Sequence, residues 1–219
     1  MPQNEAQYTV SLLNFWCLPT TAQQDILLIN AAEGENVHLR ILNKPPDAIH
    51  LLWYRGEFLD NKHIIAFLTE TSSYHISGPS TGRVTIKRDG SLLLKKVTKK
   101  DAGIYTVAVE KENSQTLIGY VKLSVYRHVR KPTIRASNNT VTEDKDAVVF
   151  TCYSDAHTIQ WLFNGTELQP TERMKLSQDH RSLTIDPVKK EDAGNYQCEA
   201  SNPISSVASV ALELDVKFE

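Results

Sequence analysis

The chain has 219 residues, of which 41% are hydrophobic and 23% are charged, and its formal net charge is −2. This composition excludes an intrinsically disordered chain, and it lacks the basic excess that is typical of a nucleic-acid-binding protein. The length suits one large domain or two small ones. No stretch is long and apolar enough to span a bilayer, so we expect no transmembrane segment in this chain.

The N-terminal 22 residues have the pattern of a secretory signal peptide. Residues 6–24 carry no charge, and a short apolar run ends in Pro19-Thr20-Thr21-Ala22, which supplies a helix break and small residues. We predict a leader over residues 1–22, cleaved after Ala22, whose usual basic start is missing or truncated. A buried N-terminal strand is the alternative. Cleavage would also remove Cys17 and leave two cysteines, which is typical of one disulfide in an oxidising compartment.

The rest of the chain consists of short runs of strand-forming residues, separated by turn residues every 8–12 positions or so. One motif occurs twice, as Asp101-Ala102-Gly103-Ile104-Tyr105 and as Asp192-Ala193-Gly194-Asn195-Tyr196, and a tryptophan, Trp53 or Trp161, precedes each copy. A tryptophan that packs in the core, followed by a tyrosine at the tyrosine corner, is the pattern of an immunoglobulin-like sandwich. The sequence therefore predicts an all-β protein made of two tandem immunoglobulin-like sandwiches.

The first domain, residues 23–127, is predicted to be a variable-type domain without a disulfide. Leu39 and Val107 occupy the two positions where such domains carry bridged cysteines. Two aliphatic side chains can fill the space between the sheets by apolar burial. We therefore expect Leu39 and Val107 to contact each other and Trp53, with Tyr105 at the tyrosine corner.

Two further features of this first copy favour the variable type. The 48 positions from Trp53 to Asp101 exceed the 31 from Trp161 to Asp192, which leaves room for the additional C′ and C″ strands. Arg83 and Asp101 stand where variable-type domains form an ion pair at the bottom of the sandwich. We expect that pair to be structural.

The second domain, residues 128–219, is predicted to be a compact constant- or intermediate-type domain with one disulfide. Cys152 and Cys198 would form the bridge over Trp161, with Tyr196 at the tyrosine corner. Closing a loop of this length stabilises a domain by about 4 kcal/mol on the chain-entropy model. A metal site would need further cysteine or histidine ligands at short spacing, and none is adjacent to these cysteines.

The sequence contains modification signals but no enzyme motif. Asn138 and Asn164 begin N-glycosylation sequons in the second domain. The seven histidines lack paired metal spacing, and there is no nucleophile elbow, phosphate loop or glycine-rich dinucleotide turn. We predict neither enzymatic activity nor a metal or other cofactor. Lysine pairs at 95–96, 99–100 and 189–190 are expected to be solvated turn residues, with binding of sulfated glycans as the alternative.

The alternation of side chains along strands orients one face of the first domain. If Trp53 and Val107 point inward, their immediate neighbours on the same strands point outward. The resulting surface is apolar with a polar rim, which on a soluble domain more often marks an interface than chance. The residues predicted to bind a partner are Leu52, Tyr54, Leu59, Asp60, Ile64, Ala108 and Glu110.

Several segments together resemble one family. They are Ser11-Leu12-Leu13-Asn14-Phe15-Trp16, Ala32-Glu33-Gly34, Trp53-Tyr54-Arg55-Gly56-Glu57, Gly78-Pro79 with Thr81-Gly82-Arg83, Glu143-Asp144-Lys145-Asp146-Ala147-Val148 and Ser201-Asn202-Pro203-Ile204-Ser205. With a bridge-free first domain ahead of a disulfide-bonded one, they resemble the carcinoembryonic antigen-related cell adhesion molecules and the pregnancy-specific glycoproteins. The resemblance covers nearly the whole chain.

The resemblance implies recognition rather than chemistry. Family members are secreted or cell-surface glycoproteins that adhere to like or related molecules through the GFCC′ face of the first domain, and some bind microbial adhesins or viral spikes there. For this chain it implies a protein partner: the same or a related family member, including a homodimer, or another cell-surface receptor. It also implies a location outside the cell or on the extracellular face of the plasma membrane.

The family's adhesive positions carry over onto six residues of this sequence. They are Tyr54, Leu59, Asp60, Ile64, Ala108 and Glu110. Glu110 stands where the best-known adhesive members have an aliphatic residue, and Ala108 stands where they have a glutamine. A carboxylate there would repel its symmetry mate in a two-fold contact unless a basic residue pairs with it. The alternative function is that of a secreted structural or polymerising matrix component without receptor-binding activity.

Overall fold

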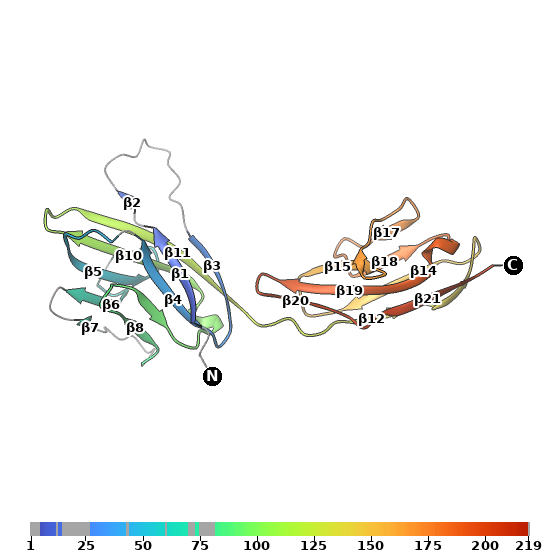
Figure 1. The fold of residues 1–219 in the computed structure, drawn as a ribbon, viewed down its shortest axis with the longest axis horizontal. Helices are drawn as coiled ribbons and strands as arrows, with labels where there is room; N and C mark the ends of the chain where they lie inside the picture. The colour runs from blue at the N-terminus through green and yellow to red at the C-terminus, as the bar shows by residue number, and fades with distance from the viewer. Residues whose placement is uncertain are drawn as a thin grey trace. The chain divides into compact units, whose positions relative to one another are not determined.

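The structure is a computed structural model that describes residues 5–11, 13–14, 27–42, 44–59, 61–69, 73–74 and 82–218. Contacts within the chain divide it into two units, Met1–Arg127 and His128–Glu219. In each unit the strands form two facing sheets (Figure 1). The prediction of an all-β protein with two immunoglobulin-like sandwiches is confirmed.

The first unit combines a narrow and a wide sheet. The narrow sheet has the order β1 (Glu5–Ser11), β4 (Asn36–Leu42), β9 (Leu92–Leu94) and β8 (Val84–Ile86). The wide sheet has the order β2 (Leu13–Asn14), β11 (Thr116–Tyr126), β10 (Gly103–Lys111), β5 (Ala48–Arg55), β6 (Ile64–Thr69) and β7 (Ser73–Tyr74), with β3 (Leu27–Ala32) parallel to β11. Strands β6 and β7 follow β5 where the additional strands of a variable-type domain are expected.

The N-terminal segment assigned to a leader contains two of these strands. β1 pairs in parallel with β4, and β2 pairs with β11. Strand pairing here matches the alternative of an N-terminal strand. Cys17 and the cleavage position after Ala22 lie outside the described residues, so the leader stays a prediction.

The core of the first unit is closed by apolar side chains. Leu39, Val107 and Trp53 are fully buried and belong to one hydrophobic cluster, and Trp53 stands opposite Val107 in the β5–β10 register. The Trp53 Nε1–H donates a hydrogen bond to the Gly90 carbonyl at 2.9 Å. Gly90 has a φ of +86°, and a Cβ there would lie 2.5 Å from Cδ1 of Leu51, so this turn requires glycine.

The second unit follows the same plan with shorter accessory strands. One sheet has the order β12 (Thr133–Ala136), β14 (Val148–Tyr153), β18 (Ser182–Ile185) and β17 (Met174–Leu176). The other has the order β13 (Thr140–Thr142), β21 (Leu212–Lys217), β19 (Gly194–Asn202), β15 (Thr158–Phe163) and β16 (Thr166–Glu167), with β20 (Ser205–Ala208) paired to β19. The C′-like strand β16 has only two residues.

A disulfide joins the two sheets of the second unit. Cys152 and Cys198 are bonded, with Cα atoms 6.1 Å apart, as the sequence predicted. Trp161 stands opposite Cys198 in the β15–β19 register, and its Nε1–H donates to the His180 carbonyl at 2.8 Å. The Tyr196 ring stacks on Phe150 with the ring centroids 4.3 Å apart.

The turn before β10 in the first unit and the turn before β19 in the second have the same polar arrangement. It contains a 3-10 helix, η1 (Lys99–Asp101) or η2 (Lys190–Asp192). The tyrosine hydroxyl donates to an aspartate carbonyl, from Tyr105 to Asp101 at 2.7 Å and from Tyr196 to Asp192 at 2.8 Å. An arginine, Arg83 in the first unit, donates to the carboxylate of the same aspartate at 2.9 Å.

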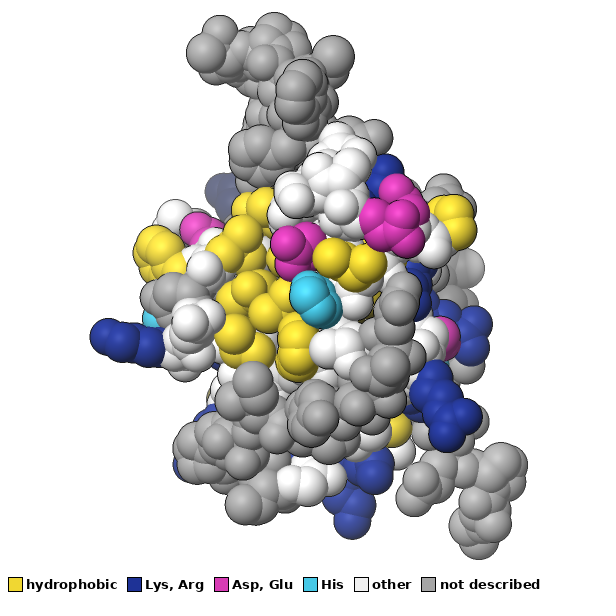
Figure 2. Space-filling model, turned by 90° about the vertical axis from the view of Figure 1, so that its left-hand side faces the viewer, with side chains coloured by type: hydrophobic (Ala, Val, Ile, Leu, Met, Phe, Trp, Pro, Cys, Tyr) yellow, Lys and Arg dark blue, Asp and Glu magenta, His cyan; other side chains and the backbone are white. Residues whose placement is uncertain are grey.

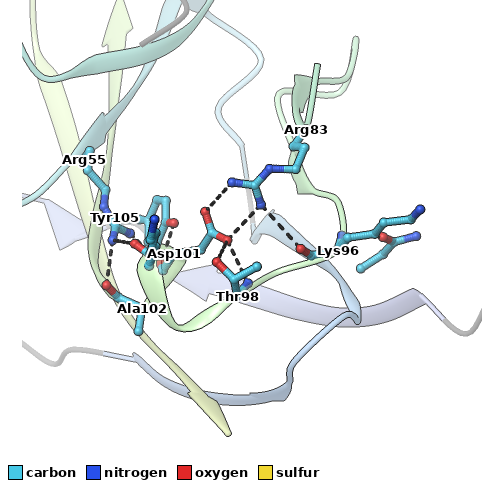
Figure 3. Close-up of polar contacts among 9 residues, drawn as sticks. Arg55, Arg83, Lys96, Thr98, Asp101, Ala102 and Tyr105 are labelled. Carbon is cyan, nitrogen blue, oxygen red and sulfur yellow. Dashed lines mark hydrogen bonds and ion pairs between the residues drawn. The ribbon is translucent and has the colours of Figure 1, made fainter. Parts of the chain in front are cut away.

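In the first unit, two groups of this turn have pKa values that are shifted from their ordinary values. Burial alone would raise the pKa of Asp101, but hydrogen bonds from Arg83 and Thr98 outweigh burial and lower it (Figure 3). Burial raises the pKa of Tyr105 to about 12. Asp101 is therefore ionised and paired at neutral pH, which agrees with the structural role predicted for it.

Candidate partner-binding face

The outward side chains of β5, β6, β10 and β11 form one continuous surface on the wide sheet. Leu52 lies between Ala108 on β10 and Phe67 on β6, and Ala108 lies next to Ile118 on β11. We call this surface the front face. It comprises His50, Leu52, Tyr54, Ile64, Phe67, Thr106, Ala108, Glu110, Ile118 and Tyr120.

The centre of the front face is more covered than the sequence predicted. Tyr54 is 7% exposed, Ala108 is 5% exposed and Ile118 is 8% exposed. Thr106 is fully buried, and its Oγ1 donates to the Gly56 carbonyl at 2.6 Å. The expectation of an exposed patch is therefore wrong for Tyr54 and Ala108, whose outward direction does not make them accessible.

Accessible apolar surface lies instead at the turn that joins β5 to β6. Phe58 is 70% exposed and Leu59 is 43% exposed, while Leu52 and Ile64 on the adjoining strands are partly buried. On the side of the molecule drawn in Figure 2, hydrophobic side chains gather beside a histidine and acidic groups. Asp60, the remaining predicted member, lies outside the described residues. The accessible part of the site is thus centred on the turn rather than on the middle of the sheet.

Glu110 has a partner within the same domain. His50 Nδ1 and Glu110 Oε2 are 3.0 Å apart, and the two side chains are 41% and 42% exposed. The His50 ring also lies 5.7 Å from the Phe67 ring. Alternation along β5 places His50 on the same side as Leu52 and Tyr54, but it cannot pair His50 with Glu110, because the pairing depends on the β5–β10 register.

A β-bulge decides which residues of β6, the predicted C′ strand, face outward. Both alternating sets of side chains on this strand are apolar, so alternation alone could not decide which set is exposed. The register shifts between Trp53 and Tyr54, which places Ala66 opposite Trp53 and Ile64 opposite Tyr54. Ile64 therefore reaches the front face, as predicted, and Phe67 joins it as a member that the sequence did not single out.

The other predicted positions lie away from the front face. Arg83 and Asp101 pair beside η1. The sequon residues Asn138 and Asn164 are both exposed in the second unit, and the Asn164 Oδ1 accepts a hydrogen bond from the Asn195 backbone at 2.9 Å. In the parts of the chain that the structure describes, no three His, Cys, Asp or Glu side chains are grouped to hold a metal ion.

Within the described ranges, no helix has the length and the apolar character needed to cross a membrane.

Two domain families match the chain. Residues 24–126 match the immunoglobulin V-set domain, and residues 131–202 match an immunoglobulin domain. Pregnancy-specific glycoprotein 22 of Mus musculus is 42% identical over 193 residues, which make up 87% of this chain and 40% of that protein. The chain therefore spans less than half the length of this relative.

Solved structures agree with these matches. The crystal structure of murine CEACAM1b is 37% identical, with a TM-score of 0.80, and the similarity covers 95% of this chain and 99% of that one. A chain in the crystal structure of the mouse coronavirus receptor-binding domain complexed with its murine receptor is 40% identical, with a TM-score of 0.76, covering 86% and 96%. These relatives are immunoglobulin-domain proteins and not enzymes, and the same holds for this chain.

Proposed function

Because this chain belongs to the immunoglobulin-superfamily group of carcinoembryonic antigen-related cell adhesion molecules and pregnancy-specific glycoproteins, we propose that it binds protein partners through the front face. The observation that carries the proposal is the accessible apolar turn at the edge of that face. Phe58 and Leu59 expose large apolar side chains there, although each could be replaced by a polar residue without disturbing the core.

The composition of the front face suits a protein partner. Apolar and aromatic side chains dominate it, and interface cores are enriched in such residues. The His50–Glu110 pair supplies a polar rim group with a fixed direction. The murine receptor that is similar to this chain binds a viral protein domain, which supports protein recognition as the kind of activity to test.

The His50–Glu110 contact also bears on self-association. An unpaired carboxylate on a two-fold axis would repel its mate, but here the carboxylate accepts a hydrogen bond from within its own domain. We therefore include a second copy of this chain among the partners, together with related family members and other cell-surface receptors.

We further propose that the protein is a secreted or cell-surface glycoprotein. Asn138 and Asn164 are exposed and lie in the second unit, so glycans there would coat that unit. Mass spectrometry of the protein from mammalian cells, before and after glycosidase treatment, tests occupancy. An unmodified mass would contradict this part of the proposal.

The binding experiment compares two variants with the same change in net charge. The full chain is passed over immobilised family ectodomains, including murine CEACAM1b, pregnancy-specific glycoprotein 22 and the chain itself. Leu59→Asp should weaken binding at least about tenfold, because it places a charge in the centre of the accessible apolar patch. Arg40→Gln on β4, exposed on the opposite sheet, changes the net charge by the same −1, is the matched control and should bind like the wild type. Equal binding by both variants would contradict the proposal.

Sedimentation of the same variants separates recognition from polymerisation. Self-association through the front face should give dimers that Leu59→Asp dissociates. Larger, concentration-dependent oligomers that survive this substitution would contradict the proposal and favour a structural matrix component.

A further inference from the structure

A small pocket adjoins the front face where β5 begins and β6 ends. It has a volume of about 140 Å³, and His50, a member of the front face, is one of its lining residues. Sites for small-molecule ligands usually have volumes of about 300–1,000 Å³. The pocket is smaller than such a site, and its place at the edge of the front face suits a single side chain of a protein bound there.

The charged groups that line the pocket are basic. Lys44, His50 and Arg88 line it together with the core residues Leu51 and Leu68, and none of the lining residues that the structure describes is an aspartate or a glutamate. Lys44 and Arg88 are both exposed, and neither forms an ion pair with another described residue. Basic groups around an apolar floor attract an anionic group.

Two described carboxylates that are close in sequence to the lining residues are engaged elsewhere. Asp47 pairs with Lys111, with Nζ and Oδ2 3.0 Å apart. Asp89 accepts hydrogen bonds from the backbone N–H of Ser91 at 2.9 Å and from its hydroxyl at 2.5 Å. These contacts direct both carboxylates at other groups than the two exposed cations of the lining.

The charge of His50 is balanced between opposing neighbours. From β10, the Glu110 carboxylate lies 3.0 Å from His50 Nδ1 and favours the protonated ring, whereas Lys44 and Arg88 disfavour it. From β6, the residue opposite His50 is the uncharged Thr69. Protonation gives the ring an N–H on each nitrogen, so Nδ1 can donate to Glu110 while Nε2 donates to a ligand. Histidine ordinarily changes its charge between pH 5 and 8, so an added carboxylate can shift this balance.

We propose that the pocket receives an aspartate or glutamate side chain of the protein partner, and that His50 takes up a proton when this side chain binds. The inference rests on the proposed binding of proteins by the front face and specifies the chemistry of the partner. The carboxylate would lie among Lys44, Arg88 and the His50 imidazolium. Because the bound state favours the protonated ring, affinity is higher at low pH and falls as the pH rises through the His50 titration.

Proton NMR titration of the full chain tests whether a carboxylate and a proton bind together. The His50 ring signal is identified by its absence from His50→Gln and is followed with pH in acetate, in acetamide, and in chloride at the ionic strength of the acetate solution. A ligand that prefers the protonated ring must favour protonation in return. Acetate should therefore raise the pH midpoint of His50 by at least about 0.3 of a pH unit relative to both controls. Equal midpoints in all three solutions, or an equal rise in acetamide, would overturn the proposal.

Two adjacent basic residues provide a matched pair of variants. Lys87 and Arg88 are consecutive residues of the turn between β8 and β9, but only Arg88 lines the pocket. Arg88→Gln should remove at least about half of the acetate-induced change in the His50 midpoint, whereas Lys87→Gln, with the same change in net charge, should remove less than about a quarter. Thermal unfolding of both variants checks that they fold. Equal reductions in the two folded variants would assign the effect to general surface charge and overturn the proposal.

Binding to the immobilised family ectodomains at about pH 6 and about pH 8 tests the link to recognition. An ectodomain that loses affinity with Leu59→Asp should bind the unmodified chain at least about threefold more tightly at the lower pH, and His50→Gln should remove that difference. Front-face binding without this difference, or a difference that His50→Gln retains, would overturn the inference and leave the proposed function intact. Absence of binding to every ectodomain would contradict the proposed function, while the acetate titration still decides whether the pocket takes a carboxylate.

Discussion

The two sandwiches hold their sheets together in different ways while keeping the same surroundings. In the second unit a disulfide between Cys152 and Cys198 crosses the core, and in the first unit Leu39 and Val107, at the positions predicted to correspond to the cysteines, are buried in one apolar cluster. The tryptophan hydrogen bond, the tyrosine corner and the Arg–Asp pair occur in both. The covalent bridge is therefore a replaceable part of this fold, and the polar contacts around it are the common framework.

The units also differ in the width of the sheet that could meet a partner. The first unit adds β6 and β7 beyond β5, whereas the second adds only the two-residue β16. The wider sheet carries the exposed turn with Phe58 and Leu59. The unit that lacks the covalent bridge is thus the one that presents the candidate binding surface.

The disulfide offers the largest expected effect. Replacing both Cys152 and Cys198 by alanine should lower the free energy of unfolding of the second unit by about 4 kcal/mol, because the unfolded chain regains loop entropy. Hydrogen exchange in increasing urea, read from peptides of each unit, should show no change in the first unit. An equal loss in both units would contradict the independence of the two cores.

The aliphatic replacement gives the next largest effect. Leu39→Ala should destabilise the first unit by about 3 kcal/mol, since Leu39 is fully buried and truncation leaves a cavity. Leu28→Ala, at a position 69% exposed, is the control and should change the free energy of unfolding by less than about 0.5 kcal/mol. Similar small effects for both variants would show that Leu39 does not take over the role of the bridge.

Removing the charge of Asp101 in the turn that both units share should have a smaller effect on stability. Asp101→Asn should cost the first unit about 2 kcal/mol, because an amide oxygen cannot replace the charged acceptor of Arg83 and Thr98. Asp47→Asn removes an ion pair with Lys111 in the same unit, whose carboxylate is 37% exposed against 17% for Asp101, and should cost less than about 1 kcal/mol. Equal costs, measured by urea unfolding at pH 7, would argue against a special role for the turn.

The same aspartate predicts a pH dependence. Its pKa is lower in the folded than in the unfolded protein, so its stabilising contribution is fully present above its unfolded pKa of about 3.9. That contribution is lost as the pH falls through the lowered folded pKa. Asp101→Asn should therefore flatten the fall in first-unit stability below about pH 4. An unchanged slope would contradict this assignment.

Much of the framework could be predicted because it depends on spacing. The repeated Asp-Ala-Gly motif, the two tryptophans and the cysteine spacing identify the fold, and alternation around Trp53 and Val107 orients the strands. Accessibility could not be predicted in the same way. Tyr54 and Ala108 point outward yet are covered by neighbours, and the His50–Glu110 contact depends on the pairing of two strands far apart in sequence.

The bulge shows a second limit of pattern analysis. Both alternating sets of side chains on β6 are apolar. Only the register shift between Trp53 and Tyr54 therefore determines that Ile64 and Phe67 lie on the front face. Similarly, Phe58 gave no periodic signal because it lies in a turn, although it is 70% exposed.

Hydrogen exchange of the full chain in complex with a bound family ectodomain tests the central proposal most directly. Protein recognition by the front face predicts protection of peptides from residues 48–69 and 103–126, with little change in peptides from residues 128–218. Protection confined to the second unit, or to β4, β8 and β9 on the opposite sheet, would contradict it.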